Sequence, residues 1–269
     1  MELRILDDIQ IDKDACQKVG AFWYFPPDDS LYHESPWPFP VKLLIKENLS
    51  KCYVTRGFLK LPFILKGWIN LDILMREIEL LKMLQDDMLL LHASCVGNTL
   101  IVGFPNSGKT YQTYSLVRDG WDLVSEEYTI INKEGYAMPY APVMRTCFSA
   151  KTLKDCEIKT NFGEKVSLAL NTIRAKLMPF MFEAVIWKNI PVSNNPSKVK
   201  YIIYGSQDRT VGEWKELAIL TENEFPFMAS EFLQAYAFAT GFDLIGLQEK
   251  QRGLIKRFVD AVNHTSKQG

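Results

Sequence analysis

The chain has 269 residues, of which 47% are hydrophobic and 23% are charged, and its formal net charge is −1. This composition is typical of a soluble globular protein with one or two domains, and the charge argues against a general binder of nucleic acid or anionic membrane. There is no run of eighteen apolar residues, no basic and apolar leader, and no CxxC pair among the five cysteines. We therefore expect a reduced, cytoplasmic protein without a structural zinc site or a disulfide framework.

The N-terminal residues 1–67 are predicted to form a β-rich region, followed by a second domain over residues 68–269. Residues 42–46 and 51–55 are β-prone runs around a polar turn, which predicts a hairpin. Residues 22–40 are dense in aromatic residues and proline, which favours a loop. Its aromatic side chains either grip a peptide or, as we favour, hold the loop against the core.

The middle of the chain alternates helical and extended patterns. Apolar residues recur at helical spacing over residues 70–85. Buried strands are predicted over residues 88–96 and 99–102, then a helix over 109–118 and a strand over 121–131.

The C-terminal half continues the mixture of strands and helices. Further predicted elements are an extended segment at 136–140, a helix over 166–182, strands at 184–187, 199–204 and 216–220, and helices near 227–240 and 247–263. This order of elements predicts an α/β fold.

The most informative motif is Gly103-Phe-Pro-Asn-Ser-Gly108-Lys109-Thr110, which fits the phosphate-loop pattern G-x-x-x-x-G-K-[ST] without a mismatch. Glycines let backbone N–H groups point at a polyphosphate, the lysine adds charge, the threonine hydroxyl reaches magnesium, and the following helix presents its positive end. The strand–loop–helix context argues against a chance match. We predict that the nucleotide is bound by Gly103, Asn106, Ser107, Gly108, Lys109, Thr110 and Tyr111.

A second motif is Asp122-Leu-Val-Ser-Glu126-Glu127, a strand that ends in an acidic pair 17 and 18 residues after Lys109. A phosphate loop needs a carboxylate to help hold magnesium, and a kinase needs a group that orients the attacking hydroxyl. A strand-end acidic pair can supply both. The alternative is that the pair is a solvated strand end.

Several stretches together resemble the HPr kinase/phosphorylase family, whose relatives include kinases found beside lasso-peptide and other modified-peptide genes. They are His92-Ala-Ser, the phosphate loop, a helix ending in Asp119-Gly120, Gly120-Trp-Asp-Leu-Val-Ser-Glu126-Glu127, and Pro139-Tyr-Ala-Pro142-Val-Met-Arg145. The resemblance covers roughly residues 75 to 146. The same core is similar to that of phosphoenolpyruvate carboxykinase, a longer chain whose substrate motifs are not found here.

The resemblance implies a P-loop kinase core that uses ATP and Mg²⁺. By position, Lys109 would hold the β- and γ-phosphates, and Thr110 and Glu127 would bind the metal. Glu126 would orient the acceptor hydroxyl. His92 would approach the transferred phosphoryl group, and Arg145 would contact phosphate or an acidic acceptor. His92 as a core histidine and Arg145 as a surface arginine remain the alternatives.

The leading functional hypothesis is a kinase that phosphorylates a serine or threonine hydroxyl of a peptide or small protein, and the resemblance also admits a homo-oligomer. The family has aspartates where this chain has Glu126 and Glu127, and each glutamate is about one methylene longer. This difference motivates the alternative of a nucleotide-sensing module with little turnover. A small-molecule kinase is a further alternative, whereas a GTPase is disfavoured because no N-K-x-D motif is found.

Overall fold

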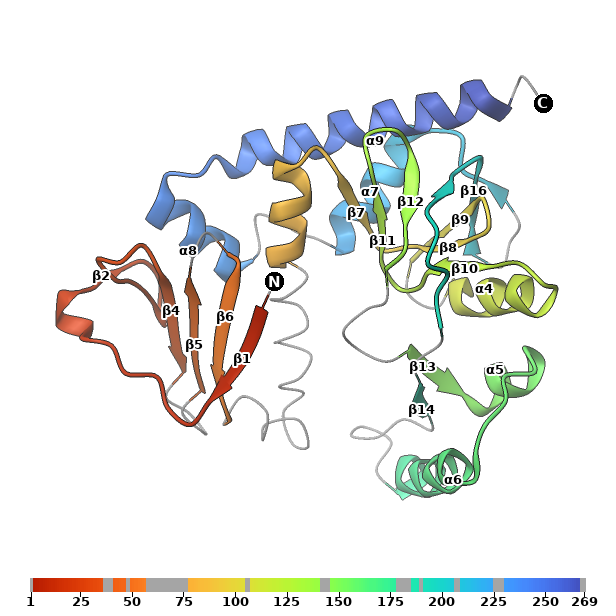
Figure 1. Ribbon diagram of the computed structural model, residues 1–269, viewed down its shortest axis with the longest axis horizontal. Helices are drawn as coiled ribbons and strands as arrows, with labels where there is room; N and C mark the ends of the chain where they lie inside the picture. Colours follow the sequence, from red (N-terminus) through yellow and green to blue (C-terminus); the bar gives the residue numbers. More distant parts are fainter. Residues whose placement is uncertain are drawn as a thin grey trace. The chain divides into compact units, whose positions relative to one another are not determined.

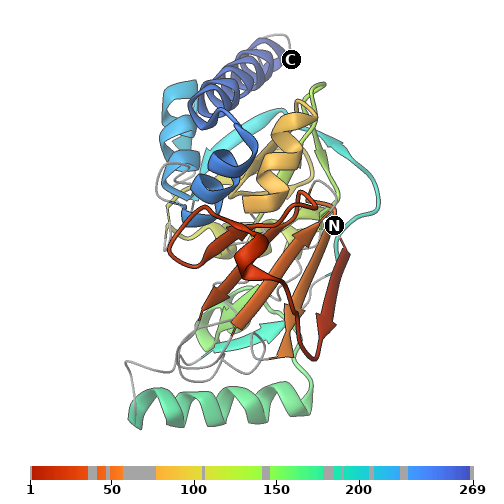
Figure 2. The ribbon, with the colours of Figure 1, turned by 90° about the vertical axis from the view of Figure 1, so that its left-hand side faces the viewer.

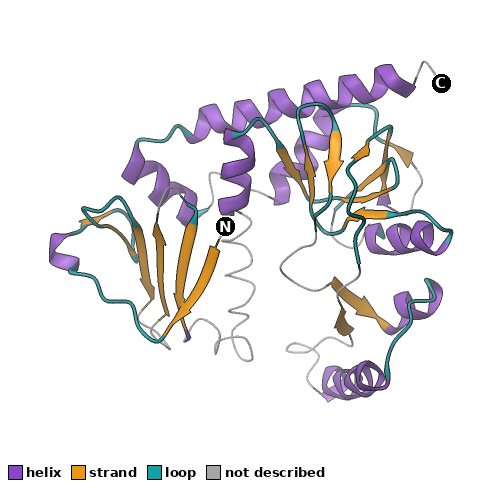
Figure 3. Cartoon of the chain, in the orientation of Figure 1, coloured by secondary structure: helices purple, strands orange, loops and turns teal. Residues whose placement is uncertain are grey.

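The computed structural model describes residues 2–35, 41–46, 49–56, 77–104, 107–140, 146–177, 185–188, 191–205, 209–224 and 230–266 (Figure 1). It is a mixed α/β structure with several β-sheets, including a β-rich N-terminal sheet, and helices near the C-terminus (Figure 3). One compact unit comprises Met1–Asp86 with Phe225–Lys250, and the other comprises Asp87–Glu224 with Gln251–Gly269. The predicted boundary between residues 67 and 68 lies outside the described residues.

The first unit is built on a sheet whose strands lie in the order β1-β6-β5-β4-β3-β2 (Figure 2). The strands are β1 (Glu2–Leu6), β2 (Gln17–Lys18), β3 (Trp23–Phe25), β4 (Leu31–Ser35), β5 (Val41–Lys46) and β6 (Lys51–Thr55). β1 is parallel to β6, and the other neighbours are antiparallel. The predicted hairpin of β5 and β6 is confirmed, with Ile45 opposite Cys52.

The segment over residues 22–40 is not the loop that was predicted, because β3 and β4 occupy part of it. Trp23 is buried and its ring contacts His33 and Phe232, at centroid distances of 4.6 and 5.8 Å. Both strands are free of proline, since Pro26 and Pro27 lie in the connection between them, and aromatic residues are favoured in strands. Trp37 and Phe39 lie outside the described residues.

Helices complete the first unit. Residues 77–85 are helical, and the predicted beginning of this helix at residue 70 lies outside the described residues. Near the C-terminus, α8 (Glu231–Thr240) and α9 (Leu244–Ser266) confirm the two closing helices, and the residues of α9 after Lys250 belong to the second unit. Ser230 caps α8 by accepting a hydrogen bond from the backbone N–H of Leu233.

The second unit contains two larger sheets, and the chain passes back and forth between them. One has the order β10-β8-β9-β16-β17, and the other has the order β15-β12-β11-β7. The first comprises β8 (Ser94–Val96), β9 (Thr99–Val102), β10 (Leu123–Ser125), β16 (Tyr201–Tyr204) and β17 (Arg209–Thr210). The second comprises β7 (Leu89–Leu91), β11 (Thr129–Ile131), β12 (Tyr136–Met138) and β15 (Ser197–Lys198).

The predicted continuous strands 88–96 and 121–131 are both wrong in the same way, because each is broken into two. The first breaks between β7 and β8, and the second between β10 and β11. β7 pairs with β11, while β8 pairs with β10 in the other sheet. At the break, the Thr129 hydroxyl donates to the Ala93 carbonyl at 2.8 Å and lies 2.6 Å from the Ser125 hydroxyl. These hydrogen bonds pair the Ala93 carbonyl and the two buried hydroxyls at the point where the strands no longer pair with each other.

Helices and a small sheet complete the second unit: α4 (Lys109–Arg118), α5 (Ala150–Asp155), α6 (Phe162–Leu177), α7 (Trp214–Glu224), β13 (Thr146–Ser149) and β14 (Val185–Lys188). The strand predicted at 216–220 is wrong, because this segment lies in α7. Leu217 and Leu220 are buried whereas Ile219 is exposed, and burial at positions three residues apart is typical of a helix. The apolar run is too short for its periodicity to distinguish a helix from a strand. Within the described residues, no helix is long and apolar enough to cross a membrane.

Candidate functional site

The phosphate-loop motif lies between the buried strand β9 and the helix α4. Gly103 has φ +147° and Gly108, the N-cap of α4, has φ +87°, so both positions favour glycine. A Cβ at Gly103 would lie 2.4 Å from Ser107 Oγ. The loop also bends through a bond from Ser107 N–H to the Phe104 carbonyl, 3.1 Å long. Asn106 lies outside the described residues.

Gly205, which follows β16, supports the loop from the neighbouring strand. Its φ is +49°, and a Cβ there would lie 2.3 Å from the backbone carbonyl oxygen of Ser107. The backbones of the two segments therefore touch, and only glycine fits. Gly205 was not among the predicted site residues, because its partner Ser107 is distant in the chain.

Lys109, His92 and Glu127 form a chain of contacts beside the loop. The Lys109 ammonium donates to the Gly103 carbonyl at 2.9 Å and lies 3.1 Å from His92 Nε2. His92 Nε2 in turn lies 3.8 Å from Glu127 Oε2. Because an ammonium can only donate hydrogen bonds, the imidazole nitrogen that bonds to Lys109 must accept. The three side chains therefore lie in one row beside the loop, with the separation of His92 and Glu127 too long for a hydrogen bond.

The break between β10 and β11 positions Glu127 and its neighbours. Glu127 adopts φ +65°, which is unusual for a residue other than glycine. The next residue, Tyr128, is buried and its ring stacks on His92 at a centroid distance of 5.3 Å. Backbone strain of this kind persists only where the surroundings enforce it, and it often marks a functional site. Sequence analysis missed Tyr128, whose signal was an aromatic residue directly after the acidic pair.

The two glutamates of the acidic pair occupy different environments. Glu126 is 3% exposed, whereas the Glu127 side chain is 35% exposed and faces His92. Charged side chains are rarely buried to this extent without compensating interactions. The alternative that both are solvated at a strand end is therefore wrong for Glu126.

Oxygen donors suited to magnesium are Thr110, in the first turn of α4, and Glu127. A hydroxyl and a carboxylate match the preference of Mg²⁺ for a few protein oxygens completed by phosphate and water. The described residues contain no group of three or more His, Cys, Asp or Glu side chains that could hold a metal ion by themselves. A metal held by Thr110 and Glu127 would depend on the nucleotide for its remaining ligands.

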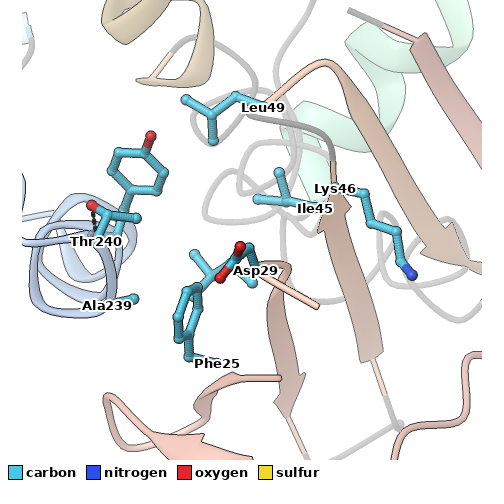
Figure 4. Close-up of a pocket in the computed structure, with 9 residues that line it drawn as sticks. Phe25, Asp29, Ile45, Lys46, Leu49, Ala239 and Thr240 are labelled. Carbon is cyan, nitrogen blue, oxygen red and sulfur yellow. Dashed lines mark hydrogen bonds between the residues drawn. The ribbon is translucent and has the colours of Figure 1, made fainter. Parts of the chain in front are cut away.

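Each unit contains a cavity lined by described residues. A cavity of about 420 Å³ in the second unit adjoins the phosphate loop at Phe104. A cavity of about 390 Å³ in the first unit is lined by Phe25, Asp29, Leu31, Ile45, Lys46, Leu49, Tyr236, Ala239 and Thr240 (Figure 4). Lys46 Nζ pairs with Asp28 at 2.8 Å, so its charge is already matched. None of the residues that line this cavity of the first unit is a predicted site residue.

The structure thus brings Gly103, His92, Lys109 and Glu127 together, and it encloses Glu126 nearby in the same strand break. Tyr111 follows Thr110 in α4 and is 42% exposed. Arg145 lies outside the described residues, so its predicted contact with phosphate or an acidic acceptor stays a prediction. Comparisons with family models, with curated proteins and with solved structures found no match.

Proposed function

We propose that the protein is an ATP- and magnesium-dependent kinase with a P-loop core of the HPr kinase and phosphoenolpyruvate carboxykinase type. Its acceptor would be a serine or threonine hydroxyl of a peptide or small protein. The observation that carries this proposal is the row Lys109–His92–Glu127 beside a glycine loop at the N-terminus of α4. A cation, a loop of backbone amides and a helix N-terminus suit a polyphosphate.

Lys109 would neutralise charge on the β- and γ-phosphates. Its ammonium is held by the Gly103 carbonyl and His92, so it is oriented before a nucleotide binds. Preorganised charge of this kind is the main source of catalysis in phosphoryl transfer. Magnesium, when bound through Thr110 and Glu127, would supply further neutralisation of the phosphate oxygens.

His92 would approach the transferred group from its position between Lys109 and Glu127. Stacking on Tyr128 fixes the plane of the ring. A fixed ring can accept from Lys109 while presenting its edge to the loop. The imidazole therefore acts in this proposal as a positioning group for both charged neighbours.

The acceptor hydroxyl needs a carboxylate that orients it, and the resemblance assigns this role to Glu126. Its burial means that an acceptor reaches it only after the break around residues 126–128 opens. Glu127 is the more accessible carboxylate of the pair. Variants Glu126→Gln and Glu127→Gln separate the two assignments, because the amide keeps the size and removes the charge.

The burial of Glu126 also favours a second candidate, a nucleotide-sensing module with little turnover. Such a protein would use the same loop and Lys109 to hold ATP. It would transfer no phosphate, since the buried Glu126 would not reach an acceptor. The two candidates therefore agree on binding and differ on transfer.

The experiment is to incubate the protein with MgATP and the peptides encoded beside its gene, and to detect added phosphate by mass spectrometry. The kinase proposal expects a phosphorylated peptide with wild type and none with Glu126→Gln. Bound ATP with no phosphorylated peptide would support the sensor instead. The variant Glu134→Gln, in an exposed turn, is the matched control.

A further inference from the structure

The cavity of about 420 Å³ in the second unit begins where the phosphate loop begins. Phe104 directly follows Gly103, and Tyr204 is the last residue of β16, level with Val102 of the parallel strand β9. A Cβ at Gly103 would lie 3.5 Å from Cζ of the Tyr204 ring. Ligands of α/β proteins bind at the carboxyl ends of parallel strands, and β9 and β16 are such a pair.

The walls of this cavity are suited to a flat, aromatic ligand. Phe104 is 42% exposed and Ile219 of α7 is 57% exposed, so both present apolar surface to solvent. Tyr204 adds a third apolar ring surface to the lining of the cavity. Nucleobases gain much of their binding energy by stacking on such side chains. The volume lies within the range of about 300–1,000 Å³ that is usual for small-molecule sites.

Arg209 gives the cavity a fixed polar side. Its guanidinium lies 4.9 Å from the centroid of the Tyr204 ring and bonds through both terminal nitrogens to the Glu216 carboxylate. A guanidinium held in a fork and stacked on an aromatic ring keeps its plane. This pairing stiffens the Tyr204 ring before any ligand arrives, which lowers the entropic cost of binding.

The cavity and the acidic pair lie on opposite sides of the loop. In the order β10-β8-β9-β16-β17, the loop follows the central strand β9. Glu126 and Glu127 follow β10 at one edge, whereas Tyr204 and Arg209 belong to β16 and β17 at the other. A nucleoside triphosphate carries its terminal phosphate and its base at opposite ends. It would therefore span the loop with one end in each site.

We infer that the cavity formed by Phe104, Tyr204, Arg209 and Ile219 is the base-binding site of the nucleotide. The inference rests on the proposed function only in requiring that the loop holds the polyphosphate. It adds that this chain distinguishes a nucleotide from a bare polyphosphate, and it names the residues that do so.

The test compares calorimetric binding of MgATP and of magnesium tripolyphosphate to the full chain. Wild type should bind MgATP about tenfold or more tightly, since stacking of one base on an aromatic side chain supplies a factor of this size. Phe104→Ala and Tyr204→Ala should each weaken MgATP binding while leaving tripolyphosphate binding unchanged. Tyr201→Ala removes an exposed tyrosine from the other end of β16 and is the matched control.

Equal affinity of wild type for the two ligands would overturn the base site while leaving polyphosphate binding intact. A Tyr204→Ala variant that is folded by circular dichroism and retains full MgATP preference would also overturn the role of that ring. Phe104→Ala provides an independent result, because the side chain is exposed and its removal leaves the sheet untouched. If wild type binds neither ligand, both the proposed function and this inference are wrong.

Discussion

The ammonium of Lys109 lies 3.1 Å from Nε2 of His92, across 17 positions of the chain. Strand register explains the contact. Ser94 of β8 pairs with Ile101 of β9, and His92 and Gly103 each lie two residues beyond this pair on their own segments. Lys109 reaches both, because α4 starts at this point and its first side chain turns back over the loop.

Replacing Glu127 with glutamine should raise the magnesium concentration needed for ATP binding several-fold, because the carboxylate at the loop loses its charge. The measurement is a magnesium titration of ATP binding. Glu134→Gln is the control, since Glu134 lies in an exposed turn of the same unit. An unaltered titration for Glu127→Gln would remove this residue from the metal site.

Gly205→Ala should weaken MgATP binding and lower the melting temperature. The new methyl group would meet the Ser107 carbonyl oxygen at 2.3 Å, at a backbone φ of +49°. The strain is therefore placed on the phosphate loop itself. Gly212→Ala is the matched control, because nothing lies within 4 Å of a Cβ there. If the two variants behave alike, Gly205 does not support the loop.

Gly253→Ala should stabilise the protein by about 1 kcal/mol, because alanine has the higher helix propensity. Gly253 is exposed in α9, and a Cβ there would meet nothing within 4 Å. Gly246→Ala in the same helix should not give this gain, since its Cβ would lie 2.4 Å from Asp243 Oδ2 and displace the carboxylate that accepts from the Gly246 N–H. Urea unfolding checks both changes. A loss of stability in Gly253→Ala would contradict the helical geometry.

Glu77→Gln should change how stability depends on pH. Burial raises the pKa of the Glu77 carboxyl from 4.5 to about 7, against a hydrogen bond with Ser230 that lowers it. Because the folded state binds this proton more tightly, the group's stabilising contribution is complete below pH 4.5 and is lost as the pH rises to about 7. The glutamine variant cannot lose it.

The difference in unfolding free energy between Glu77→Gln and wild type should therefore shift in favour of the variant, on the order of 2 kcal/mol, between about pH 4.5 and pH 8. Urea unfolding at the two pH values measures it. Asp86→Asn, in an exposed turn, is the control. His33, whose pKa burial lowers to about 4, contributes the opposite slope in both proteins, so its effect cancels. A constant difference would contradict the burial of Glu77.

The loop and its flanking elements could be predicted from sequence because their signals are local. The motif from Gly103 to Thr110 specifies its own backbone, and β9 and α4 follow from short apolar and helical patterns. The closing helices α8 and α9 were predicted for the same reason. These features need no knowledge of distant partners.

The breaks that build the site could not be predicted, because they depend on pairing between distant segments. Residues 88–96 and 121–131 each look like one buried strand, and periodicity does not show where such a run changes sheets. The polar residues His92, Ser125 and Thr129 within these runs were the available signal. Their meaning becomes clear only when the two breaks lie side by side.

The most direct test of the central claim is calorimetric binding of MgATP to wild type and Lys109→Ala. If Lys109 holds the nucleotide phosphates, the variant should bind at least about tenfold more weakly, because a charge-assisted contact to phosphate is lost. Lys133→Ala, in an exposed turn of the same unit, should bind like wild type. Unchanged affinity in a folded Lys109→Ala variant would contradict the assignment of this loop as a nucleotide site.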